Sequence, residues 1–392
     1  MKWSGILLFL CTLALTATGM VILASVGDVQ GSTLFGNKYH FVIRQTMYLS
    51  VSLVGCLAAA LIRPPFLFQK KVLVFCLLLI VASILAVELF GITTKGAQRW
   101  IRLGGMQVQP SEFVKVLFIL VFSGWVGATS CKNQLLVPGV LIPCAGLGIV
   151  VGSFVALQHD LGSAVMLSAT CGVLLFLSGA RFKYLLIVGG VALLLAVQYV
   201  LNDPERMSRV TASVQMYVSD QSAPQEEKSD DDDSYQVRMS LSAFGAGGLT
   251  GKGYGNSLFK QRYLPENHTD FILAMIGEEF GLVATSCCWF LFLCITVLGI
   301  RISLRAPDRQ QQLFASGLTF YLGSSAAINI GVVTGALPTK GLALPFLSYG
   351  GSNLMASYLI VGLLLSIAFH TKPKEEHEPE NYTLASTDIW GG

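Results

Sequence analysis

The chain has 392 residues, of which 53% are hydrophobic and 12% are charged, and its mean hydropathy is +0.63. Because about a quarter of the residues in a soluble domain are charged, this composition excludes an ordinary soluble globular protein and indicates an integral membrane protein. The formal net charge of +3 adds little and gives no reason to expect nucleic acid as a partner.

Ten apolar runs have lengths near the roughly 20 residues that cross a bilayer. They predict an all-α, polytopic integral membrane protein with about ten transmembrane helices. The first run could be a secretory signal peptide, but it is longer than a typical signal core and no clear cleavage site follows it, so an uncleaved helix is expected. In chain order the runs are 4–25, 41–62, 72–90, 113–128, 137–156, 162–177, 184–201, 271–300, 312–334 and 352–368.

The distribution of Lys and Arg predicts which loops face the cytoplasm, because these residues accumulate on the cytoplasmic side of a span. With the amino terminus inside, every inside loop is basic and both termini are cytoplasmic. The outside loops also hold basic residues, including Arg99, Arg102 and Lys340. The inside residues are Arg63, Lys70, Lys71, Lys132, Arg181, Lys183, Arg301, Arg305, Arg309, Lys372 and Lys374.

One connection is much longer than the others, and residues 202–270 form a predicted extracytoplasmic loop. Its acidic stretch 219–234 is almost free of apolar residues and is expected to be a disordered insert. The four adjacent aspartates at 230–233 could instead bind a cation, but they lack the spaced ligands and turn glycine of a calcium loop. Residues 371–392 are expected to be a disordered cytoplasmic tail, which leaves a single membrane domain over residues 1–370.

Residues 243–257 are rich in glycine, which favours turns and a close approach of the backbone to a ligand. The spacing of a Walker phosphate loop is absent, because Gly253 follows Lys252 where Ser or Thr is required. A short re-entrant or interfacial segment fits better, with backbone amides facing an anionic headgroup.

The loop between the third and fourth runs carries the first candidate site. Glu112 and Lys115 are three residues apart on a predicted helix, so they form either a self-neutralised ion pair or part of a binding site. Arg99, Trp100 and Arg102 could anchor the chain at the membrane interface. The arginines could equally donate charge-assisted hydrogen bonds to a lipid pyrophosphate, while the tryptophan stacks on a sugar or shields the site.

Two further polar clusters open to the same predicted outer face. Asp160 could simply cap the helix that follows it. Lys340 is the only charge in the loop before the last run, and a lone loop lysine is usually just solvated. Because all these clusters share one face, we expect a single outward-facing cavity.

Asp270 opens the run 271–300, which at 30 residues would be about 45 Å long as one helix. The aspartate could be the N-cap of that helix. A carboxylate at this place, near Glu266 and His268, could also act as a general base on a substrate hydroxyl. The capping role and the catalytic role are compatible.

Four motifs in this order resemble the SEDS family of bacterial cell-wall synthesis proteins (FtsW, RodA and SpoVE). They are GAQRWI with QPSEFVK, QHDLGS, YLPENHTDFILAMIGEEFG, and NIGVVTGALPTKGLALPFLSYGGS, and the resemblance covers nearly the whole chain. The run AFGAGGLTGKGYGNS is more similar to the division-type members than to the elongation-type members. His159, Ser163, Met239 and Val333 depart from the family pattern.

The resemblance implies a peptidoglycan glycosyltransferase that polymerises lipid II on the outer face of the bacterial cytoplasmic (inner) membrane, at the division septum. Its implied partners are a class B penicillin-binding protein, other divisome proteins, and lipid II with undecaprenyl-linked glycan. Asp270 matches the family's catalytic acid. No cofactor is required by the resemblance, although a divalent cation (Mg²⁺ or Mn²⁺) stays open. The residues implied to bind substrate are Arg99, Trp100, Arg102, Glu112, Lys115, Asp160, Gln236, Glu266, His268 and Lys340.

Three alternatives remain open on the sequence alone: a lipid II flippase, an elongation-type polymerase and a divisome scaffold. Flipping a charged headgroup should require polar residues near the middle of the membrane, whereas the ionisable residues here cluster at the predicted outer helix ends. A scaffold would not need Asp270 in a cavity. The sequence therefore favours an outward-facing enzyme.

Overall fold

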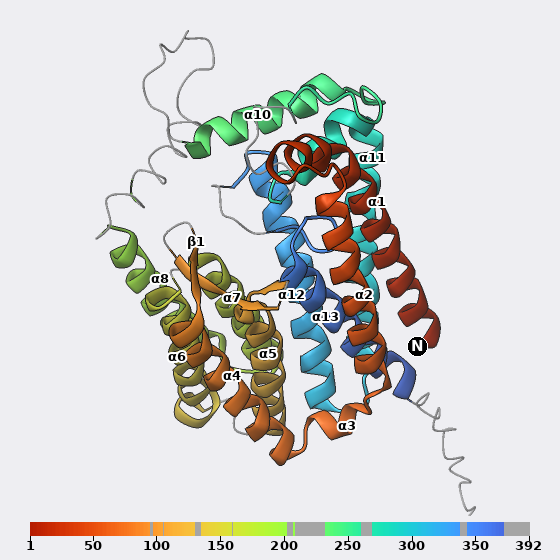
Figure 1. The fold of residues 1–392 in the computed structure, drawn as a ribbon. Helices are drawn as coiled ribbons and strands as arrows, with labels where there is room; N and C mark the ends of the chain where they lie inside the picture. The colour runs from red at the N-terminus through yellow and green to blue at the C-terminus, as the bar shows by residue number, and fades with distance from the viewer. Residues whose placement is uncertain are drawn as a thin grey trace, which may run out of the picture.

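The computed structural model describes residues 1–94, 97–104, 106–129, 135–158, 160–201, 207, 232–259, 269–337 and 343–371. Figure 1 shows a bundle of long helices, with a further helix across its top and a small sheet lower down, at the upper ends of the helices on the left. We call this end of the bundle the loop end. In chain order the helices are α1 (Lys2–Phe35), α2 (His40–Leu61), α3 (Pro64–Leu67), α4 (Lys70–Phe90), α5 (Pro110–Ala128), η2 (Val137–Leu141), α6 (Ile142–Ala156), α7 (Leu161–Leu177), α8 (Phe182–Leu201), α10 (Asp232–Gly247), α11 (Ile272–Leu304), α12 (Arg309–Val333) and α13 (Gly351–His370).

Each of the ten predicted apolar runs coincides with a helix. Eight spans in the described part of the chain are long and apolar enough to cross a membrane, counting η2 and α6 together as one. The shorter apolar helices α7 and α8 occupy the other two predicted positions. The prediction of an all-α, polytopic membrane protein is therefore confirmed.

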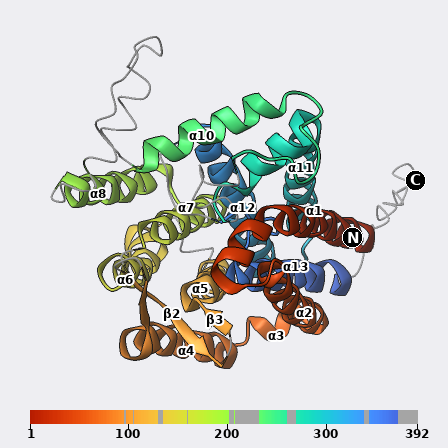
Figure 2. The same cartoon turned by 45° about the horizontal axis from the view of Figure 1, so that its top comes forward.

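Helices α5, α12 and α13 form the centre of the bundle, while α4, α6 and α8 lie at its periphery (Figure 2). In α13, 78% of the most apolar stretch is buried in protein, against 17% in α4. Hydroxyl groups link helices of the bundle, as where Thr16 of α1 and Tyr358 of α13 are hydrogen-bonded at 2.9 Å. Such bonds contribute to helix association in membranes, because burial of apolar surface does not distinguish protein from lipid.

Helix α11 is broken at Gly281 (φ 75°, ψ −172°), so the expectation of one 30-residue helix is wrong. Residues 272–280 form a first half that is buried almost completely. Residues 282–304 form a second half of about 34 Å, long enough to cross the hydrocarbon core. A Cβ atom at position 281 would lie 2.4 Å from the backbone oxygen of Leu249, and the positive φ also favours glycine. The high hydropathy of the run as a whole gives no signal of such a break.

The glycine-rich segment packs its backbone against this break. The amides of Lys252 and Gly253 donate to the backbone oxygens of Glu278 and Glu279, each at 2.9 Å. A Cβ atom at Gly251 would lie 2.2 Å from the Glu279 oxygen, so glycine permits the approach. Because these two amides are used within the protein, the expectation that they face an anionic headgroup is wrong.

Between α4 and α5 the chain forms a three-stranded antiparallel sheet in the order β1 (Ile92–Thr94), β2 (Ala97–Leu103), β3 (Met106–Val108). The sequence does not predict this sheet, because β1 and β3 have only three residues each and so show no periodic pattern. The side-chain amide of Gln98 donates to the backbone oxygens of Val87 and Gly91, both at 3.0 Å. These bonds satisfy carbonyl groups at the end of α4 and so tie the sheet to that helix.

Helix α10 lies within the predicted long loop and crosses the loop end near α11 and α12 (Figures 1 and 2). The Ser240 hydroxyl donates to the Val333 oxygen at 2.7 Å. The Phe244 ring lies so close to Gly277 that a Cβ atom there would come within 2.3 Å of it. Residues 232–234, the end of the acidic insert, begin this helix. Residues 219–231 of the insert and the tail beyond Thr371 lie outside the described residues, so their disorder stays a prediction.

Candidate active site

Hydrogen bonds between distant segments join the polar clusters at the loop end. The described bonds connect β2 to the end of α6, the residues before α11 to α12, and the segment before α13 to the residues before α11. The sequence-based expectation that these clusters share one end of the bundle is consistent with this arrangement. The donors and acceptors are Arg99 Nε to Gln158 O at 2.7 Å, Asn329 Nδ2 to Asp270 O at 3.0 Å, and Ser348 Oγ to Thr269 O at 2.5 Å.

Lys115 is the most deeply buried charge of the predicted site, with 2% of its surface exposed. Its Nζ lies 2.8 Å from Glu112 Oε1 and 3.1 Å from Ser163 Oγ. The ammonium group also lies over the ring of Tyr321, at 5.4 Å from the centroid. A buried ammonium requires such partners, because an unpaired charge in the interior is strongly destabilising. The ion pair predicted from the spacing is present, and it is a structural element whether or not it also binds a ligand.

Asp160 connects the start of α7 to this lysine. Its Oδ1 accepts the backbone amide of Ser163 at 3.1 Å, so the predicted helix cap is present. The negative charge of Asp160 acts on Lys115 together with that of Glu112. The capping aspartate is therefore also part of the charged cluster.

The three predicted residues of β2 have different surroundings. Arg99 is held by the Gln158 oxygen, only two residues from Asp160. Trp100 is half-buried, and Arg102 is exposed on the strand opposite Gln107 of β3. The strand therefore places a fixed guanidinium beside the charged cluster and a more exposed one further along the sheet.

A stripe on α12, which the sequence analysis missed, links the charged cluster to Asp270. Tyr321, Ser325 and Asn329 are spaced four residues apart and so lie on one face of the helix. Tyr321 contacts Lys115, while the Asn329 amide donates to the backbone oxygen of Asp270. Tyr321, which contacts Lys115, and Asn329, which contacts Asp270, are eight residues or about 12 Å apart along α12. Polar residues at i, i+4 and i+8 in an apolar run were the signal that could have found it.

Asp270 is half-buried, two residues before the start of α11. The N-cap is Phe271, whose backbone oxygen accepts the amide of Ala274 at 3.0 Å, so the assignment of Asp270 as N-cap is wrong by one residue.

The remaining predicted site residues are less closely connected to this cluster. Gln236 is half-buried on α10, one turn before Ser240. Glu266, His268 and Lys340 lie outside the described residues. In the part of the chain that the structure describes, no three His, Cys, Asp or Glu side chains are grouped to hold a metal ion. A role for Mg²⁺ or Mn²⁺ stays a prediction, with no ligand set among these residues.

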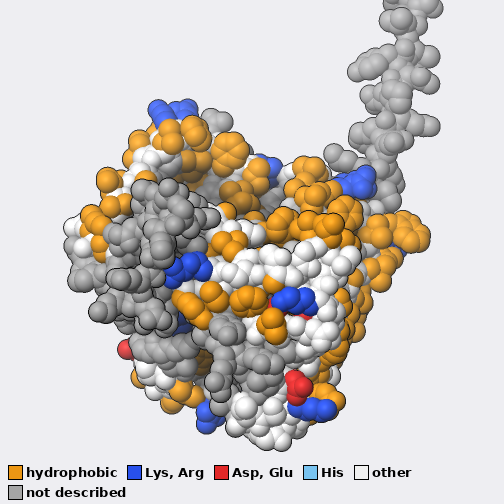
Figure 3. Space-filling view, turned by 90° about the horizontal axis from the view of Figure 1, so that it is seen from above, with side chains coloured by type: hydrophobic (Ala, Val, Ile, Leu, Met, Phe, Trp, Pro, Cys, Tyr) orange, Lys and Arg blue, Asp and Glu red, His pale blue; other side chains and the backbone are white. Residues whose placement is uncertain are grey.

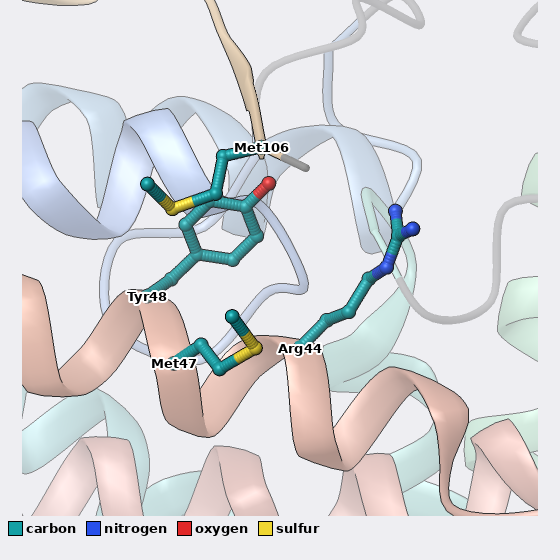
Figure 4. Close-up of a pocket in the computed structure, with 4 residues that line it drawn as sticks. All are labelled: Arg44, Met47, Tyr48 and Met106. Carbon is teal, nitrogen blue, oxygen red and sulfur yellow. The ribbon is translucent and has the colours of Figure 1, made fainter. Parts of the chain in front are cut away.

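A small pocket lies between α2 and β3. Its volume is about 190 Å³, and it contains none of the predicted site residues. Figure 4 shows Met106 of β3 next to the ring of Tyr48, with Arg44 and Met47 rising from α2. The Tyr48 hydroxyl oxygen accepts the backbone amide of Gln107 at 3.2 Å, so the pocket wall helps to hold the sheet.

Seen from above, the loop end shows Lys and Arg side chains among apolar ones, with fewer Asp and Glu side chains on the visible face (Figure 3). Such a distribution attracts anionic groups. Membrane-crossing helices with a charged cluster held at one end define a multi-pass membrane protein whose polar site lies at the mouth of its bundle.

The chain belongs to the FtsW/RodA/SpoVE family of cell cycle proteins, because residues 6–373 match the model of that family. A probable peptidoglycan glycosyltransferase FtsW of Coxiella burnetii is 37% identical over 376 residues, which cover 93% of this chain and 95% of that protein. A protein of the same name from Geobacter sulfurreducens is 35% identical over 370 residues, 94% of this chain and 95% of that protein.

Solved structures share the fold. A chain in a structure that reports the coordination of polymerization and crosslinking by a peptidoglycan synthase complex aligns with a TM-score of 0.74 at 25% identity. The alignment covers 93% of this chain and 98% of that chain. The rod shape determining protein RodA of Thermus thermophilus aligns with a TM-score of 0.64 at 24% identity, over 93% of this chain and 97% of that chain.

Proposed function

We propose that this chain is a peptidoglycan glycosyltransferase that polymerises lipid II into glycan strands. The curated relatives named above carry the name of that enzyme. The observation that carries the proposal is the placement of Asp270 at the loop end, joined through Asn329 and α12 to the buried Lys115 cluster. A carboxylate and a set of cations on one rigid framework are what glycosyl transfer to a pyrophosphate-linked sugar requires.

In this mechanism the Asp270 carboxylate is the general base. It accepts the proton of the acceptor sugar 4-hydroxyl while that oxygen forms a bond to the anomeric carbon of the lipid-linked donor. The bond from the anomeric carbon to the pyrophosphate oxygen breaks on the opposite side, so the configuration inverts. The proton resides on Asp270, and the lipid pyrophosphate leaves with its additional negative charge.

The basic residues stabilise that charge. Arg99 and Arg102 reach the sheet edge of the site, and Lys115 supplies a fixed positive charge deeper in the bundle. Charge-assisted hydrogen bonds from such groups to phosphate oxygens are about twice as strong as neutral ones. Trp100 shields this region from water or stacks on a sugar. The roles of Gln236, Glu266, His268 and Lys340 are those of further substrate contacts.

The loop end faces outward, across the cytoplasmic membrane of a bacterium, and both chain termini are cytoplasmic. The basic inside loops support this orientation. A class B penicillin-binding protein crosslinks the product, in line with the synthase complex whose chain shares this fold. The relatives carry the name FtsW, which supports a role at the division septum with other divisome proteins.

A gel assay of glycan strands tests the proposal. Purified chain with its cognate penicillin-binding protein is supplied with lipid II in detergent micelles, where no separate compartments exist and a flippase makes no product. Wild type is expected to form strands, Asp270→Asn to form none, and Asp308→Asn at the opposite end of α12 to match wild type. Strands from a folded Asp270→Asn protein would overturn the assignment of the base. Wild type that moves lipid II across vesicles yet makes no strands would favour the flippase.

A further inference from the structure

The carboxylate of Glu278, on the first half of α11, is completely buried and accepts hydrogen bonds from four groups. Lys252 Nζ and the Leu258 amide donate to Oε1, at 3.0 and 2.8 Å. The Ser257 hydroxyl and the Phe259 amide donate to Oε2, the latter at 3.4 Å. We call Glu278 and these four donors the carboxylate clamp.

The donor set identifies what position 278 must provide. A buried carboxylate is strongly destabilising unless its oxygens are paired, and here one cation, one hydroxyl and two backbone amides pair them. Glutamine has the same shape but only one acceptor oxygen, and its amide hydrogens would face the remaining donors. Replacement by glutamine therefore removes the clamp while it preserves side-chain volume.

Residues 257–259 depend on the clamp more than residues 252 and 253 do. The amides of Lys252 and Gly253 are held by the backbone of α11 at its break and have no need of the Glu278 carboxylate. The amides of Leu258 and Phe259, by contrast, donate to that carboxylate. Loss of the carboxylate is thus expected to release the end of the glycine-rich segment and leave its middle in place.

The clamp lies on the short helix that begins two residues after Asp270. That half-helix is held at its start by the Asn329 bond to the Asp270 oxygen and by the Ser348 bond to the Thr269 oxygen. At its other end it is held by the clamp, eight residues or about 12 Å from Asp270. Both ends of the short helix that follows Asp270 are therefore fixed by polar contacts.

We propose that Glu278 is a positioning residue for Asp270: its buried carboxylate clamps residues 257–259 to the first half of α11 and fixes where the catalytic carboxylate stands. The inference rests on the proposed function, because it takes Asp270 as the base. A misplacement of about 1 Å at the reacting groups costs on the order of a hundredfold in rate, so the clamp acts on turnover.

The test compares Glu278→Gln with wild type in the complex with the penicillin-binding protein. We expect kcat to fall by about tenfold to a hundredfold, with KM for lipid II within about twofold, because substrate contacts remain. Hydrogen exchange should rise at the amides of 258 and 259 and stay unchanged at 252 and 253. Glu88→Gln, at an exposed carboxylate near the end of α4, is the matched control and should match wild type in both measurements.

The outcomes separate the clamp from the proposed function. If wild type forms strands and Glu278→Gln has an unchanged kcat, the positioning role of Glu278 is contradicted and the proposed function is not. The same holds if hydrogen exchange rises at the amides of 258 and 259 while kcat stays normal. Wild type that makes no strands contradicts the proposed function. If Glu278→Gln does not fold, Ser257→Ala and Lys252→Met each remove one donor and should lower kcat in a graded way; unchanged kcat in both overturns the clamp.

Discussion

The glycines of the packed side of the bundle and those of its flank differ in what surrounds them. On the packed side, a Cβ atom at Gly362 of α13 would lie 2.4 Å from the Cys56 backbone oxygen, and one at Gly19 of α1 would lie 2.6 Å from the Leu347 oxygen. On the flank of α6 and α8, a Cβ atom at Gly146 or Gly189 would meet nothing within 4 Å. Glycine in a membrane helix therefore marks close backbone packing only on one side of this protein.

The buried share of each membrane helix differs in the same way between the packed side and the flank. Among the eight membrane spans of the described chain, α4 has the highest mean hydropathy and the smallest buried share. Helices α5, α12 and α13 are less apolar than α4, occupy the centre and carry buried polar residues, including Lys115, Asn329 and Ser352. Low hydropathy alone does not place a helix there, because α2 has a mean hydropathy of 1.4 in its most apolar stretch and only 28% of that stretch is buried. Polar residues in a span thus point to the protein interior and the site, and a purely apolar span points to lipid.

The largest effect is expected where a charge is buried on the packed side. Lys115→Met leaves Glu112 without its cation, and breaking a buried pair costs about 3 to 5 kcal/mol of stability. The double variant Lys115→Met/Glu112→Leu removes both charges and should recover most of that stability, as measured by thermal unfolding in detergent. Strand formation should stay lost in both variants if the lysine also serves the substrate. Recovered glycan strand synthesis in the double variant would show that Lys115 and Glu112 have only a structural role.

Alanine substitutions at the two kinds of glycine test directly whether close backbone packing distinguishes them. Gly362→Ala should lower stability by about 1 to 3 kcal/mol, because the added methyl group overlaps the backbone of α2. Gly146→Ala should be neutral or stabilising by up to about 1 kcal/mol, because alanine is the better helix former and the space is open. Thermal unfolding of the two variants measures the difference in stability. An equal loss of stability in both variants would contradict the difference in packing at the two glycines.

A smaller effect is expected where α10 contacts the packed side. Ser240→Ala removes the hydrogen bond to the Val333 oxygen and should lower stability by about 0.5 to 1.5 kcal/mol. The measurement is the unfolding midpoint, with Ser50→Ala on the exposed face of α2 as a control that also loses a local hydroxyl bond. A shift no larger than that of the control would show that α10 does not depend on this contact.

The smallest effect concerns pH. Burial raises the pKa of Tyr349, between α12 and α13, with a further increase from Tyr48 and an opposing decrease from Arg44. Because the folded protein favours the protonated phenol, this contribution is complete below the unfolded pKa of about 10 and is lost as pH rises further. The unfolding midpoint of Tyr349→Phe should therefore fall less steeply than that of wild type above pH about 10. An equal pH dependence of the unfolding midpoint in Tyr349→Phe and wild type would contradict the raised pKa of Tyr349.

Much of the fold could be predicted because apolar length is a strong signal: all ten runs correspond to helices. The break at Gly281 and the three-stranded sheet could not, because a backbone dihedral angle and pairing with three-residue strands leave no trace in hydropathy. The pairing of Glu112 with Lys115 followed from helical spacing. The clamp at Glu278 did not, since its donors come from a segment about 20 residues earlier in the chain.

The central claim is that the Asp270 carboxylate takes up a proton during glycosyl transfer. The most direct measurement is strand synthesis by Asp270→Ala with and without added formate, which can enter the space left by the side chain and replace the missing carboxylate. We expect no strands without formate and partial recovery that increases with the formate concentration, while Lys115→Met gains nothing from it. Strand synthesis by Asp270→Ala at the wild-type rate without formate would show that the Asp270 carboxylate is not the base.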